Sequence, residues 1–238
     1  MDTTTRQRRL GLGGLLTLAM VAVIALAHPA ATMAQDTGDD EIEIADLPGV
    51  QAAVSRTFMI DFAAMFSMEA SPTPETSGTQ LIALGGTIVQ FDSDDHAKDA
   101  YTTILTEIQK PVDLATPDAV TFTTVDLGGD LGDERTGLRI TGDESDSLGG
   151  DVVALVVRDG SLIYLITGIA ESGDPSDAVV AFTKAVMGGK AGGGEATFNE
   201  DGTSTGGLWD KFPAPDDPAV AGLPSVLDAD PMTDDSGE

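Results

Sequence analysis

The stretch VVALVVRDGSLIYLIT, residues 152–167, decides the fold. It contains two apolar runs, 152–157 and 162–167, separated by Arg158-Asp159-Gly160-Ser161. An Asp-Gly pair between apolar runs predicts a tight β-hairpin, because the preferred two-residue turn needs positive φ at both central positions. Neither run alternates apolar with polar residues, so we expect both faces of the sheet to be covered there.

Further strand patterns flank this hairpin at residues 81–91, 120–125 and 136–141, where β-branched and apolar residues concentrate. A helix is predicted after Asp92 or Ser93, with a buried stripe of Ala97, Ala100, Tyr101, Ile104, Leu105 and Ile108. A second helix is predicted from Asp174-Pro175-Ser176-Asp177 to Gly188, with a stripe of Ala178, Ala181, Phe182 and Ala185. The order β-α-β-β-β-β-α predicts a single α+β domain in which two or three helices pack on an antiparallel sheet.

The segment 50–68 fits two periodicities. Apolar residues recur every four positions from Val50 to Phe66, which is typical of a helix, yet Phe58, Ile60 and Phe62 alternate as in a strand. The helix is the preferred interpretation, and the strand stays open.

The first 34 residues have the pattern of an export signal. Arg6, Arg8 and Arg9 precede an apolar stretch, and Thr32-Met33-Ala34 offers small residues before a cut ahead of Gln35. If the segment is not cleaved, it anchors the chain with the rest outside. Both alternatives predict a secreted or extracytoplasmic domain, and membrane contact only if the leader is retained.

The remaining chain divides by composition. Residues 35–46 read as an acidic linker, 47–188 as the α+β domain, 189–207 as a Gly-rich linker and 208–238 as an acidic C-terminal tail, so disordered acidic linkers are expected to flank the domain. In the tail, Trp209 and Phe212 are candidates for docking a partner. The alternative is that this segment folds back onto its own domain as a small apolar cluster.

The chain carries a formal charge of −28, with 40 acidic and 12 basic residues. Binding to nucleic acid or to an anionic membrane surface requires lysine and arginine, so neither partner is expected. The acidity fits a cationic partner, an envelope protein or calcium. The preferred interpretation is a heavily solvated surface, which would suit high salt, because runs of charge are usually solvated faces or tails.

Asp92, Asp94, Asp95 and Asp99 form the densest carboxylate cluster and are the candidate calcium ligands. The ordinary alternative is that Asp94 and Asp95 stabilise the positive end of a helix. No other cofactor is expected.

Catalytic patterns are missing from the sequence. The chain has no cysteine, and His96 is the one histidine beyond the leader, so a zinc site and cysteine catalysis are disfavoured. No Gly-x-Ser-x-Gly pattern accompanies His96. We name no catalytic residues and expect a non-enzymatic domain.

Residues 81–187 resemble the extracellular sensor-like domains of bacterial receptor kinases and small exported actinobacterial proteins. The resemblance lies in Val89-Gln90-Phe91-Asp92-Ser93, in Leu131-Gly132-Asp133-Glu134 and in the hairpin at 156–160 followed by a last helix. These motifs are structural, so the resemblance implies a fold and transfers no functional residue.

The sequence therefore predicts an exported domain that binds or senses a small ligand, an ion or an envelope partner. The alternatives are a secreted hydrolase with an unrecognised carboxylate site and an inert, salt-adapted envelope protein.

Overall fold

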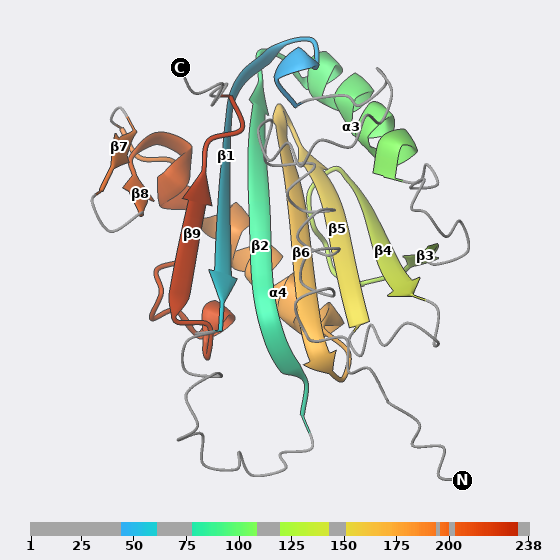
Figure 1. Ribbon diagram of the computed structural model, residues 1–238. Helices are drawn as coiled ribbons and strands as arrows, with labels where there is room; N and C mark the ends of the chain where they lie inside the picture. Colours follow the sequence, from blue (N-terminus) through green and yellow to red (C-terminus); the bar gives the residue numbers. More distant parts are fainter. Residues whose placement is uncertain are drawn as a thin grey trace, which may run out of the picture.

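The computed structural model describes residues 44–60, 78–108, 120–142, 151–193, 196–199 and 203–232. The expected leader, most of the acidic linker, residues 61–68 and the last six residues lie outside these ranges. Figure 1 shows the arrangement of the described elements.

The core of the domain is a seven-stranded sheet in the order β3-β4-β5-β6-β2-β1-β9, in which every pair of neighbours is antiparallel. Two α-helices lie in the described part of the chain, α3 (Asp94–Ile108) and α4 (Ser176–Gly188). This confirms the predicted α+β class. The strands are β1 (Val50–Met59), β2 (Gln80–Phe91), β3 (Val120–Val125), β4 (Glu134–Gly142), β5 (Asp151–Asp159), β6 (Leu162–Ser172) and β9 (Ser225–Ala229).

The predicted hairpin joins β5 to β6. Asp159 pairs with Leu162, so the two-residue loop is Gly160-Ser161, one position later than the expected Asp159-Gly160 turn. Gly160 has a φ of 57°, a conformation that glycine adopts without strain.

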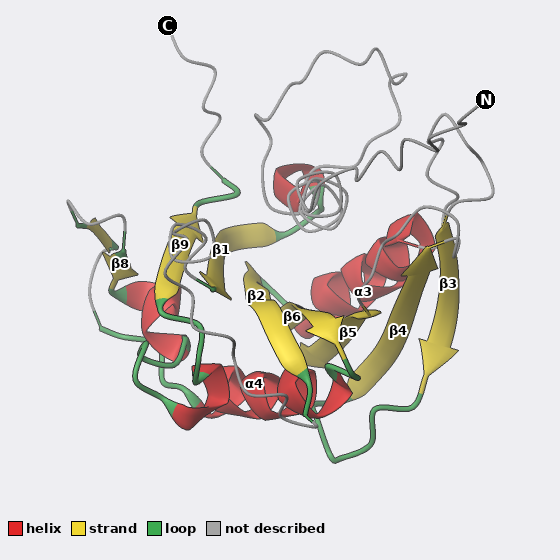
Figure 2. Ribbon diagram, turned by 60° about the horizontal axis from the view of Figure 1, so that its bottom comes forward, coloured by secondary structure: helices red, strands yellow, loops and turns green. Residues whose placement is uncertain are grey.

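Both faces of the sheet are covered, as the two unbroken apolar runs predict. Helix α3 and the short helix η1 (Ile44–Asp46) pack on one face, and α4 packs on the other (Figure 2). Along β6, Ile163 and Leu165 face α3, whereas Tyr164 and Ile166 face α4. The hairpin thus supplies side chains to both cores.

The helix preferred for the start of 50–68 is wrong, because residues 50–59 form strand β1. This strand pairs with β2 from Val50 to Met59, so neighbouring side chains point to opposite faces of the sheet. Val54 and Phe58 point into the core on the α4 side, and Ala53 joins the core on the α3 side.

The predicted buried positions are confirmed for α3 but only partly for α4. In α3, four of the six predicted positions are buried and Leu105 and Ile108 pack against the same core. In α4, Phe182 is buried as predicted, but the other buried positions are Val179, Thr183 and Val186. The valines bury more apolar area than the predicted alanines. Gly168 also lets α4 approach closely, since a Cβ there would lie 2.5 Å from Val179 Cγ2.

The expected domain limit at residue 188 is too early. After the small strands β7 (Thr197–Phe198) and β8 (Ser204–Thr205), the chain forms the short helices η3 (Gly207–Lys211) and η4 (Pro218–Val220) and then β9. Leu208, Val220 and Leu223 belong to the core on the α4 side. The apolar residues of this segment complete a face of the sheet that α4 alone does not cover.

Candidate functional site

The predicted calcium ligands lie around the start of α3. Ser93 caps this helix, since its Oγ accepts a hydrogen bond from the backbone N–H of His96 at 3.3 Å. Asp94 and Asp95 are exposed in the first turn, where the helix dipole favours negative charge. Asp99 is exposed one turn further on. The local sequence therefore gives these aspartates a structural purpose that needs no ligand.

Asp92 is engaged with His96. Its Oδ1 lies 2.5 Å from His96 Nδ1, and its backbone N–H donates to the carbonyl of Gly49 at 2.8 Å. Gly49 has a φ of 80°, and a Cβ there would lie 2.3 Å from His96 Nδ1. The hydrogen bond raises the pKa of His96 above its ordinary value of 6.5 and lowers the pKa of Asp92 below 3.8.

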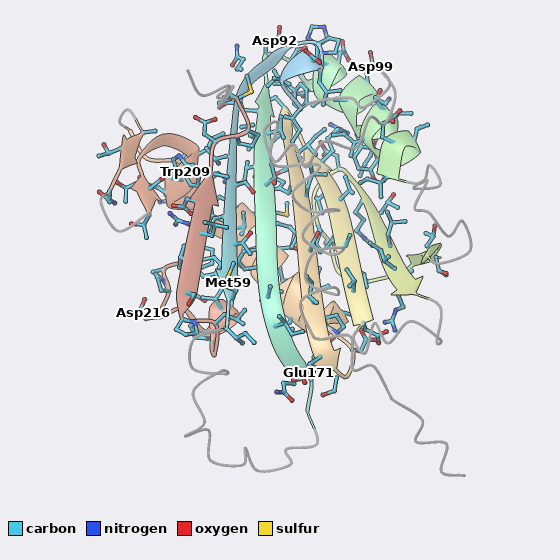
Figure 3. All side chains as sticks on the ribbon, in the orientation of Figure 1. Met59, Asp92, Asp99, Glu171, Trp209 and Asp216 are labelled. Atoms are coloured by element: carbon cyan, nitrogen blue, oxygen red, sulfur yellow. The ribbon has the colours of Figure 1, made fainter. Side chains whose placement is uncertain are left out.

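The hairpin brings a further carboxylate to this end of the molecule. A methyl group on Gly160 would lie 3.7 Å from Asp94 Oδ1, and the N–H of Gly160 donates to Asp133 Oδ2 at 2.9 Å. We call this set the acidic end; Figure 3 labels two of its members. It comprises Asp92, Asp94, Asp95, Asp99 and Asp133.

Metal binding gains no support from this geometry. Within the described ranges, no group of three or more His, Cys, Asp or Glu side chains is arranged to hold a metal ion. The calcium assignment for Asp92, Asp94, Asp95 and Asp99 remains a hypothesis from the sequence.

The titration of His96 offers a direct check of the contact with Asp92. We expect its NMR titration midpoint to lie above 6.5 in residues 35–238, because the charged imidazole is favoured by the neighbouring carboxylate. The stabilisation is therefore present below pH 6.5 and is lost as the pH rises through the raised pKa. Asp92→Asn should return the midpoint toward 6.5. Asp95→Asn should move it less, because Asp95 acts through charge alone; equal shifts would contradict the hydrogen bond.

Trp209 and Phe212 are not exposed for docking. Trp209 is 1% exposed and Phe212 is 6% exposed, and both belong to the core on the α4 side. Their rings each lie 5.5 Å from the guanidinium carbon of Arg56 in β1. The structure thus follows the fold-back alternative for this segment.

Sequence reasoning missed the ion pair beside these rings. Arg56 Nε and Nη2 donate to the two oxygens of Asp228 at 2.7 Å each, and Nη2 also donates to the carbonyl of Ser204 at 2.6 Å. The Asp228 side chain is 2% exposed. The available signal was a charged residue, Arg56, in a strand whose other residues are all uncharged.

Other cationic side chains also link separate elements of the fold. Arg139 of β4 binds Asp174 ahead of α4 and lies 3.4 Å from Asp151. Hydrogen bonds from Ser176 and Arg139 lower the pKa of Asp174 to about 2. Lys211 donates to the carbonyl of Gly189 at 2.8 Å, and burial lowers its pKa. These contacts fasten the elements to one another.

The motif Leu131-Gly132-Asp133-Glu134 is structural in this chain. Leu131 is buried, and the Asp133 N–H donates to the carbonyl of Arg158 at 2.7 Å. Arg158 Nη1 lies 3.1 Å from Asp133 Oδ2, and its Nε lies 3.5 Å from Glu134 Oε2. Together these contacts hold the start of β4 against the end of β5.

Gly132 within this motif should tolerate no side chain. Its φ is 59°, and a Cβ would lie 2.3 Å from the carbonyl oxygen of Arg158. Gly132→Ala should lower the free energy of unfolding by roughly 2–4 kcal/mol, through strain at positive φ and a backbone clash. Gly128→Ala is the matched control, because Gly128 has a φ of 67° but nothing within 4 Å. Urea unfolding of both variants makes the comparison, and equal losses would contradict the clash.

Comparisons with known proteins give a weak structural likeness only. No protein-family model matches the chain, and no curated protein matches it. The crystal structure of the extracellular domain of PknH from Mycobacterium tuberculosis matches with a TM-score of 0.29 and 10% sequence identity. The match covers 40% of this chain and 49% of that chain, so this chain spans about half the length of the structure it matches.

The matched structure is an extracellular domain, but a match at this TM-score does not establish a shared fold or a shared function. In the described ranges, the helices are too short or too polar to cross a membrane. The class defined by the fold and its surface is a small, acidic, cysteine-free α+β domain.

Proposed function

We propose that the chain is an exported, non-enzymatic domain that binds a positively charged partner of the cell envelope through its acidic end. The observation that carries the proposal is that exposed carboxylates from two distant parts of the chain, Asp133 and the first turns of α3, meet beside the loop at Gly160.

The leader-like sequence supports the location. Its basic start, apolar stretch and small residues before Gln35 are typical of export. A domain outside the cytoplasm meets other envelope proteins, and a high negative charge speeds its encounter with cationic ones.

The pairing of the arginines within the domain supports a positively charged partner. Arg56 and Arg139 are bound to carboxylates that fasten strands and helices. Arg158 balances Asp133 and Glu134 beside the acidic end. Asp94, Asp95 and Asp99, by contrast, remain at the surface, where a lysine- or arginine-rich segment can reach them.

The test measures binding of a hexalysine peptide to residues 35–238 by calorimetry at low salt. The triple variant Asp94→Asn/Asp95→Asn/Asp99→Asn should bind at least about 10-fold more weakly. The control Glu171→Gln/Asp177→Asn/Asp216→Asn changes the charge equally with exposed residues elsewhere, two of which Figure 3 labels far from Asp92. Asp177 lies in the first turn of α4, so this control also removes a helix-terminal charge. The control should retain the affinity to within about twofold.

Equal losses in both triple variants would mean that only net charge matters, and the inert, salt-adapted alternative would then replace the proposal. Thermal unfolding with millimolar calcium, and separately with molar sodium chloride, distinguishes the remaining outcomes. An ion that binds only the folded state stabilises it by RT ln(1 + [L]/Kd), whereas screening requires far more salt and shows no preference for calcium. A calcium-specific shift would favour ion binding over a protein partner.

A further inference from the structure

Strand β9 is held to the sheet by few buried side chains. Each of its five residues is half-buried or exposed, whereas its neighbour β1 contains a buried run from Ala53 to Arg56. Leu227 is 45% exposed, and Val226 packs only partly against the core. The strand pairs with β1 alone, from Ser55 to Met59, and forms one edge of the sheet. Segments with little buried apolar area can open without unfolding of the whole domain.

The contact that fastens β9 is the pair between Arg56 and Asp228. The two residues are direct partners across the strands, and both guanidinium contacts to the carboxylate measure 2.7 Å. Arg56 also lies against the rings of Trp209 and Phe212. The guanidinium is therefore in a largely dry position, where loss of its carboxylate partner is costly.

If β9 left the sheet, two kinds of group at the outer edge of β1 would lose their partners. The backbone N–H and C=O groups of that edge would lack strand partners, and unpaired edges recruit other strands. Arg56 would keep the carbonyl of Ser204 but would lack a carboxylate. A replacement strand must therefore supply both backbone pairing and an acidic side chain.

We propose that β9 is a releasable edge strand, and that the vacated edge of β1 accepts an extended acidic segment of another protein with a carboxylate opposite Arg56. The required pattern follows from the register. Val226 lies opposite Phe58, Leu227 opposite Thr57 and Asp228 opposite Arg56, so the site takes an apolar residue, any residue, then an acid. This is β-strand addition with one charged specificity position. It is independent of binding at the acidic end.

Amide hydrogen exchange of residues 35–238 tests the release. We expect the amides of 225–229 to exchange at least about 100-fold faster than those in the centre of β2 and β6, because opening of β9 does not require global unfolding. If they exchange as slowly as the central strands, β9 does not open separately and the proposal is overturned.

Peptide binding tests the acceptor. A labelled peptide of residues 223–232, LPSVLDADPM, should bind the Asp228→Ala chain at least about 10-fold more tightly than the wild-type chain, in which β9 competes. A peptide with asparagine in place of Asp228 should bind that variant at least about 10-fold more weakly. Equal binding of the two peptides, or no binding to the folded variant, overturns the acceptor. If Asp228→Ala does not fold, the exchange measurement on the wild-type chain decides alone.

Discussion

Trp209→Ala is expected to lower the free energy of unfolding by about 3–5 kcal/mol, the range for truncating a buried large aromatic residue. Trp209 is 1% exposed and lies in the core between α4 and the sheet. Its removal leaves a cavity and takes one ring away from Arg56. For a domain of this size the loss corresponds to a fall of roughly 10 °C in Tm, measured by circular dichroism.

Leu227→Ala is the matched control, since Leu227 belongs to the same C-terminal segment but is 45% exposed. It should change stability by less than about 0.5 kcal/mol. A small effect of Trp209→Ala, similar to that of the control, would show that residues 203–232 are not part of the cooperative domain. The chain has one tryptophan, so its fluorescence in the wild-type protein reports the same burial independently.

The hairpin and α3 could be predicted because their information is local. Residues 152–167 carry their own strand pattern and turn, and the stripe from Ala97 to Ile104 repeats at helical spacing. The position of β1 could not be decided locally, because its apolar residues fit both periods. Pairing with β2 along the whole strand determines the outcome, and that pairing is tertiary.

The burial of the C-terminal segment could not be predicted, for a related reason. Its apolar residues are separated by prolines and aspartates, so no window has a clear period. They are buried because α4 leaves part of the sheet open and η3, η4 and β9 return to cover it. Arg56 and Asp228 are 172 positions apart, and nothing in either neighbourhood indicates the other.

The acidic end was predicted only in part. Asp92, Asp94, Asp95 and Asp99 are neighbours in the sequence, so their grouping needed no fold. Asp133 joins them because β4 begins beside the β5–β6 hairpin, whose Gly160 N–H binds Asp133 and lies next to Asp94. The contact of Asp92 with His96 follows from helical spacing, with Gly49 leaving room for the ring.

Arg56→Met and Asp228→Leu are each expected to lower the free energy of unfolding by about 3–5 kcal/mol, because either one leaves its partner as a buried, uncompensated charge. The double variant should be much less damaging than the sum. Two apolar side chains of similar volume remove both charges together, and methionine sulfur packs favourably beside Trp209 and Phe212.

Full recovery in the double variant is not expected. The carbonyl of Ser204 loses the hydrogen bond from Arg56, and the Ser204 N–H loses its acceptor on Asp228. Each backbone group left unpaired costs about 1–3 kcal/mol if it stays buried, and less if water reaches it. We therefore expect the double variant to lie within about 3 kcal/mol of the wild type, with a coupling energy of several kcal/mol in a urea-unfolding double-mutant cycle. Additive losses would mean that the two side chains act separately, and the pair would then not be what fastens β9 to β1.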